Sequence, residues 1–173
     1  EGVTSEACSL AGHLGLDNVV VIYDDNSITI DGNTELSFTE DVKARFLAYH
    51  WNVIEVPGEG VDLAAIEAAI NQAKDTQGKP TLIKLQTVIG YGAPTKQGTH
   101  GAHGAPFGDD EIKAMKENFG WDGDKTFVVP DEVKTEYAKV VTKGKAANVR
   151  TTYLKWAEWI GEHQFDEDGE VEH

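Results

Sequence analysis

The sequence predicts an α/β domain with a mainly parallel β-sheet and helices on both faces. Three apolar, β-branched runs, at residues 18–23, 51–56 and 81–87, each follow a segment with helical periodicity. Alternation of helix and strand patterns in this way is typical of parallel sheets. The stretch from Val19 to Tyr23 is continuously apolar, which indicates a strand that is covered on both faces.

The first helix is expected to precede this strand. Thr4 or Ser5 can cap its N-terminus with a side-chain oxygen, and the helix then covers residues 6–14. Gly15 supplies the left-handed residue that commonly ends a helix. The strand at 18–23 follows and gives way to an acidic turn.

Two further helices fill the gaps between the strand patterns. One is expected after Thr39, and Asp62 can cap the other, which ends before Gly78-Lys79-Pro80. Each has apolar side chains at helical spacing. These are Val42, Phe46 and Tyr49 in the first, and Leu63, Ile66, Ile70 and Ala73 in the second.

A long glycine-rich loop is predicted directly after the third strand. Residues 90–108 contain six glycines and two prolines, too many for a regular element. Because the loop follows a strand, it should lie at the carboxyl edge of the sheet, where ligands of α/β proteins collect. Loops of this length in compact domains are usually functional or disordered, and function is favoured here.

The C-terminal part is predicted to be helical. Helices are expected near residues 109–119, 131–142 and 150–163, with an acidic tail after them. The predicted division places a ligand-binding domain at residues 1–140. Residues 141–173 then form a helical linker and the tail.

The composition limits the function classes. A net charge of −15, from 30 acidic and 15 basic residues, opposes binding to nucleic acid or to an anionic membrane. No apolar run approaches the roughly 18 residues of a membrane helix. The single cysteine, Cys8, fits a reducing compartment, and we expect a cytoplasmic protein, with plastid or peroxisome as alternatives. The chain opens with Glu1 in helix-like sequence, so a natural start there is not expected.

Two segments carry candidate chemistry, and the first follows the first strand. Asp24-Asp25-Asn26-Ser27-Ile28 offers the oxygen ligands that a hard divalent cation prefers. The same composition is also ordinary for a turn. From the residues alone, the turn is the favoured interpretation.

The second segment lies in the glycine-rich loop, at residues 88–92 and 98–106. Glycine allows a close approach of the backbone to a ligand, and His100 and His103 can donate hydrogen bonds to phosphate oxygens. Two exposed surface histidines would give the same pattern, and both interpretations stay open. A zinc site is less favoured because neither a cysteine nor a third histidine is near in sequence.

Taken together, these motifs resemble transketolases in order and spacing. The matching segments are residues 1–13, 21–26, 30–32, 89–92 and 103–106. The resemblance covers residues 1–140 and implies part of the thiamine-diphosphate-binding fold. The last thirty or so residues resemble the linker helices that lead to the second domain of that family.

The resemblance implies a role for five residues. The side chain of Asn26 and the carbonyl of Ile28 would bind Mg²⁺ or Ca²⁺, and a third protein ligand, an aspartate in the Gly-Asp-Gly opening of the family motif, is absent from this sequence. His103 would lie between the diphosphate and the reacting carbon. Ile89 would pack near the thiazolium ring, and the Gly90 backbone would lie near phosphate.

The resemblance says less about two other residues, Glu1 and His100. Glu1 resembles a buried glutamate in an acidic network that joins the two active sites of the family's homodimer. His100 has no secure counterpart in the family and ranks below His103.

The implied activity is the reversible transfer of a two-carbon ketol unit from a ketose phosphate to an aldose phosphate. Its partners would be sugar phosphates, the remaining segments of the same enzyme and a second subunit. The chain by itself is expected to be inactive. Dihydroxyacetone synthase, the formaldehyde-using relative, is the alternative, while a non-catalytic binding subunit or a signalling receiver module is less favoured.

Overall fold

The computed structural model describes residues 2–147 and residue 155. These divide into two compact units, Glu1–Asp124 and Lys125–His173, which are described separately. The first unit contains the sheet and both candidate segments. In the second unit, α5 (Asp131–Ala147) is the element that lies within the described residues.

The main sheet of the described part has three parallel strands, as the sequence predicts. They are β1 (Val20–Asp25), β4 (Asn52–Val56) and β5 (Thr81–Gln86), in the order β1-β5-β4. In the register of β1 with β5, Val20 pairs with Thr81 and Asp25 with Gln86. The first strand therefore begins and ends two residues later than predicted and includes both aspartates.

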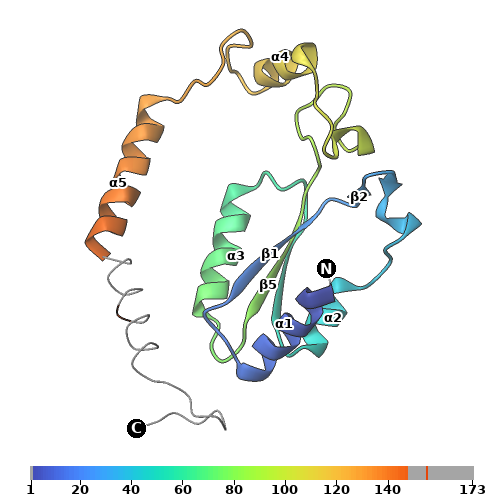
Figure 1. Cartoon of the computed structure of the whole chain (residues 1–173), viewed down its shortest axis with the longest axis vertical. Helices are drawn as coiled ribbons and strands as arrows, with labels where there is room; N and C mark the ends of the chain where they lie inside the picture. The colour runs from blue at the N-terminus through green and yellow to red at the C-terminus, as the bar shows by residue number, and fades with distance from the viewer. Residues whose placement is uncertain (1, 148–154, 156–173) are drawn as a thin grey trace. The chain divides into compact units, whose positions relative to one another are not determined.

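Helices cover both faces of this sheet, which confirms the predicted architecture (Figure 1). On one face lie α1 (Gly2–Leu14) and α2 (Val42–Ala48), and on the other lies α3 (Leu63–Asp75). The central strand β5 contributes side chains to the core on both faces of the sheet, because successive side chains of a strand point to opposite faces. Leu82 packs in the α1 and α2 cluster, and Ile83 packs in the α3 cluster.

The two clusters form the core of this unit. In the first, the Trp51 indole Nε1 donates to the Cys8 carbonyl at 2.8 Å, and its ring meets Phe46 edge-on at 5.1 Å between centroids. Burial of this aromatic pair gives favourable apolar contact together with a satisfied polar N–H. The second cluster packs the small side chains Ala69 and Ala73 closely against β5.

Helix α1 differs from its prediction at the N-terminus. It is already helical at Gly2, so neither Thr4 nor Ser5 caps it. Its C-terminus agrees with the prediction, since Gly15 has a φ of 63°. Gly15 N donates to Gly12 O at 3.2 Å and Leu16 N to Ala11 O at 3.2 Å, the pair of bonds that closes a Schellman motif.

The other two helices begin at aspartates. Asp62 caps α3 as predicted, accepting from Ala65 N at 3.0 Å. Asp41 caps α2 by accepting from Ala44 N at 2.9 Å, so this helix begins slightly later than Thr39 suggested.

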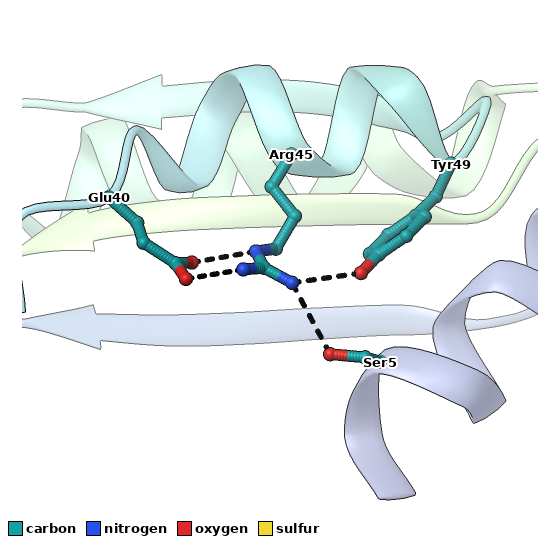
Figure 2. Close-up of polar contacts among 4 residues, drawn as sticks. All are labelled: Ser5, Glu40, Arg45 and Tyr49. Atoms are coloured by element: carbon teal, nitrogen blue, oxygen red, sulfur yellow. Dashed lines mark hydrogen bonds and ion pairs between the residues drawn. The ribbon is translucent and has the colours of Figure 1, made fainter. Parts of the chain in front are cut away.

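An arginine of α2 joins that helix to α1 (Figure 2). The Arg45 guanidinium binds the Glu40 carboxylate through two nitrogens, with Nε to Oε2 at 2.7 Å. It also donates to Tyr49 Oη at 3.1 Å and to Ser5 Oγ at 3.4 Å. Ser5 therefore contacts α2 from within α1 instead of capping its own helix.

Short elements connect this framework at the carboxyl side of the sheet. Strands β2 (Ile28–Thr29) and β3 (Gly32–Asn33) form an antiparallel pair, and the 3-10 helix η1 (Thr34–Leu36) follows. The sequence did not predict this hairpin. After β5 the long loop contains η2 (His100–Ala102) and leads to α4 (Asp109–Asn118), near the predicted bounds of 109–119.

In the second unit, α5 begins at the predicted residue and extends beyond 142 to Ala147. The predicted domain boundary at 140/141 falls inside this helix and stays a prediction. The helix expected at 150–163 lies outside the described residues except for residue 155, which is helical. Among the helices that the structure describes, none has both the length and the apolar character to cross a membrane.

Candidate site at the carboxyl edge of the sheet

The two candidate segments leave the sheet from neighbouring strand ends. Asn26 follows the last residue of β1, and Thr87 follows the last residue of β5. Thr87 N donates to the Asp25 carbonyl at 3.2 Å, and Thr87 Oγ1 donates to the Asp24 carboxylate. The sheet therefore brings the acidic turn and the base of the glycine-rich loop to the same carboxyl edge, as predicted.

The turn at Asn26 is stabilised by its own side chain. Asn26 Oδ1 accepts from Ile28 N at 3.0 Å, and Asn26 Nδ2 donates to Asp24 Oδ1 at 3.4 Å. Ser27 between them has a φ of 60°, and its carbonyl accepts from Thr34 N at 3.0 Å. This is the Asx-type turn that the composition favoured. An amide oxygen has two lone pairs, so the oxygen of Asn26 still has one available for a cation.

The aspartates beside this turn are occupied by protein partners. Asp25 forms an ion pair with Lys84 at 2.8 Å, and the hydrogen bond that Lys84 donates to this carboxylate raises the pKa of Lys84. Asp24 accepts from Thr87. Within residues 2–147 and 155, no group of three His, Cys, Asp or Glu side chains is arranged to hold a metal ion. One oxygen of each of these two carboxylates is thus engaged with Lys84 or Thr87.

The base of the loop is packed against its returning half. Gly90 has a φ of 64°, and a Cβ atom built there would lie 3.0 Å from the Ala102 methyl carbon and 3.2 Å from the Phe107 ring. Ile89 O accepts from Gly98 N at 2.8 Å. A side chain at position 90 would thus be both strained and crowded.

Both histidines of the loop are exposed. His100 begins η2, and His103 follows it with its main-chain N donating to His100 O at 3.0 Å. Neither imidazole is part of the core clusters, and both are accessible to a ligand. The Ala102 methyl group, next to His103, lies 3.0 Å from the position that a Cβ atom would take at Gly90, so this part of the loop returns to its base.

Sequence reasoning missed the residues that hold the loop in this shape. Glu111, in the first turn of α4, accepts from Thr95 N at 2.8 Å, Thr95 Oγ1 at 3.0 Å and Lys96 N at 3.1 Å. These bonds lower the pKa of the Glu111 carboxyl, and the bond from Thr95 N has the largest effect. The available signal was a glutamate in the first turn of a helix after a glycine-rich loop. Acidic residues are common there in any case, because the helix dipole stabilises negative charge at the N-terminus.

Comparison with known proteins gives one consistent result. The family model described as transketolase, thiamine diphosphate binding domain, matches residues 1–170. Transketolase 1 of Saccharomyces cerevisiae is 51% identical over 165 residues, which are 95% of this chain and 23% of that protein. The transketolase of Nostoc sp. is 51% identical over 144 residues, 83% of this chain and 21% of that protein.

The fold agrees with solved transketolase structures. The transketolase of Pichia stipitis in complex with sedoheptulose 7-phosphate superposes with a TM-score of 0.80 at 46% identity, over 94% of this chain and 24% of that one. The chain thus spans between 21% and 24% of the length of these relatives.

Proposed function

The chain belongs to the transketolase family, and we propose that it supplies the part of such an enzyme that holds the diphosphate and the metal of thiamine diphosphate. The observation that carries this proposal is the meeting of the Asn26 turn and the glycine-rich loop at one carboxyl edge, through the bonds of Thr87 to Asp24 and Asp25. Ligands of parallel sheets bind at such edges. The complete enzyme would transfer a two-carbon ketol unit reversibly between sugar phosphates.

The proposed metal ligands are the side-chain oxygen of Asn26 and the main-chain carbonyl of Ile28. Mg²⁺ and Ca²⁺ both take oxygen ligands. The hydrogen bond from Ile28 N to Asn26 Oδ1 at 3.0 Å fixes the amide, so its second lone pair has a defined direction. A third protein ligand and the diphosphate oxygens would complete the shell.

The loop is proposed to contribute three residues to the cofactor site. Gly90 is proposed to bring its main chain near phosphate, as a residue without a side chain permits, and Ile89 is proposed to supply an apolar contact. His103, which is exposed, is proposed to donate a hydrogen bond to phosphate oxygen and to a hydroxyl of the substrate. When bound, thiamine diphosphate would supply the carbanion chemistry, and the protein would bind and orient the reactants.

The free edge of the sheet supports the proposed partners, namely the remaining segments of the same enzyme and a second subunit. β1 forms one edge of the three-stranded sheet, and its Val20, Val21 and Ile22 are 38%, 37% and 51% exposed. An apolar edge strand in a stable protein is normally paired or covered. By contrast, Val56 at the end of the opposite edge strand, β4, is 5% exposed.

The proposal also covers the domain division, the location and the excluded partners. Residues 1–140 are proposed to form the cofactor-binding domain, and residues 141–173 a linker. A cytoplasmic location, with plastid or peroxisome as alternatives, is supported by Cys8, which is buried and not in a disulfide. The acidic net charge of −15 supports partners other than nucleic acid and membrane.

The test is an acceptor comparison with the complete enzyme that contains this chain. With xylulose 5-phosphate as donor, we expect kcat/KM for ribose 5-phosphate to exceed that for formaldehyde by at least about tenfold, or about 1.4 kcal/mol. A ratio in favour of formaldehyde would assign the enzyme to the dihydroxyacetone synthases instead. The isolated chain of 173 residues serves as the control and is expected to show no turnover.

A further inference from the structure

One lysine side chain closes the glycine-rich loop. Lys96 Nζ donates to the Pro106 carbonyl at 2.9 Å and to the Phe107 carbonyl at 3.1 Å. The same nitrogen lies 5.4 Å from the centre of the Phe107 ring, within the range of a cation–π contact. The ammonium group thus joins two points of the chain that are ten residues apart.

The main chain of Lys96 is itself held in place. Its N–H donates to Glu111 Oε1 at 3.1 Å, so the first turn of α4 fixes its position. Its carbonyl accepts from Thr99 N at 3.2 Å and from Thr99 Oγ1 at 2.8 Å. The side chain therefore closes the loop from a base that the neighbouring elements keep fixed.

The closed span includes one loop residue that is proposed to meet the cofactor and packs against a second one. His103 lies between Lys96 and Pro106. The Phe107 ring, which Lys96 contacts, lies 3.2 Å from the position of a Cβ atom at Gly90. Movement of the segment around Phe107 would therefore displace His103 and uncover Gly90 together.

We propose that Lys96 is a positioning residue, which holds the loop closed so that His103 and Gly90 keep their places at the cofactor. This inference rests on the proposed function. An ammonium group has three N–H donors, and two of them already bind carbonyl oxygens of the loop. Lys96 thus acts through His103 and Gly90, while phosphate binding is left to other groups.

The experiment compares Lys96→Met with Lys96→Arg in the complete enzyme. Methionine keeps an unbranched side chain without the donors, whereas arginine can again donate to two carbonyls. Lys79→Met is the matched control, since Lys79 is exposed and lies just before β5, at the end of the strand away from the loop. The readouts are hydrogen exchange of residues 97–107, kcat, and KM for the donor, and each variant is also made in a His103→Ala background.

For Lys96→Met we expect exchange in residues 97–107 to rise at least about tenfold and kcat to fall roughly ten- to a hundredfold, as misplacement of a reacting group does. KM should change less than kcat. Lys96→Arg should restore both readouts to within about threefold of the parent, and Lys79→Met should alter neither. The loss of kcat should largely disappear in the His103→Ala background, because residues that act through one group are not additive.

Unchanged loop exchange in Lys96→Met would overturn the proposal, as would a kcat loss that adds fully to that of His103→Ala. A His103→Ala enzyme with full turnover would instead remove the role proposed for His103. The exchange measurement would then still decide whether Lys96 closes the loop over Gly90.

Discussion

The turn at Asn26 and the loop at residues 90–108 end neighbouring strands, yet they are held in different ways. In the turn, the amide of Asn26 binds Ile28 N two residues away. In the loop, Thr95 binds Glu111 sixteen residues away, and the Gly92 carbonyl accepts from Asn118 Nδ2 twenty-six residues away, at 2.9 Å. The Asn26 amide is thus held within its own turn, whereas the loop also depends on elements that follow it in the chain.

This difference has an energetic consequence. Ordering a long loop costs more conformational entropy than closing a turn of a few residues, so the loop depends on contacts that offset this cost. Glu111 and Lys96 supply such contacts. The proposed metal ligands should therefore tolerate changes in α4, whereas the position of His103 should be sensitive to them.

The largest effect is expected from His103→Ala in the loop. Turnover of the complete enzyme should fall roughly ten- to a thousandfold, the range for removal of a positioned electrostatic donor. The fold should be retained because the side chain is exposed. Steady-state kinetics and thermal unfolding test this, with His100→Ala as the neighbouring control that should lose less. Near-normal turnover together with lower thermal stability would identify His103 as a structural residue.

A second change tests the turn. Asn26→Ala removes a proposed metal ligand and leaves Ile28 N without its acceptor, so affinity for metal and thiamine diphosphate should fall about tenfold or more. Asn26→Asp keeps an oxygen at the same position and should retain more affinity. Calorimetry of the complete enzyme at matched Mg²⁺ or Ca²⁺ measures both variants. Equal affinity of Asn26→Ala and the parent would exclude Asn26 from the metal site.

The smallest effect is expected from Glu111→Gln, and it should depend on pH. The folded protein lowers the pKa of Glu111, so the carboxylate contributes stability above the usual glutamate pKa of about 4.3, and this contribution is lost as the pH falls through the lowered folded value. At pH 7 the variant should unfold at a slightly lower temperature than the parent, and the difference should shrink as the solution is acidified.

Glu67→Gln, on the exposed side of α3, is the control for this comparison. It should leave the unfolding temperature at pH 7 nearly unchanged. A difference for Glu111→Gln that grows on acidification would contradict the assigned direction of the pKa shift.

Local patterns in the sequence determined most of the framework. The strand runs, the Asp62 cap and the left-handed Gly15 were predicted because each depends on residues within a few positions of one another. The main error, the cap at Thr4 or Ser5, concerned a side chain whose partner, Arg45, lies forty residues away. The Asn26 turn could also be predicted, because its main hydrogen bond joins residues only two positions apart.

Only the tertiary structure decided how the glycine-rich loop is closed. The sequence marked residues 90–108 as a candidate ligand loop through its glycines, but no local pattern there predicts the partners of Lys96 and Glu111. Their partners are set by the direction in which the loop turns and by where α4 begins. Such contacts join residues that are distant in the chain, so their energy depends on three-dimensional packing that local preferences do not encode.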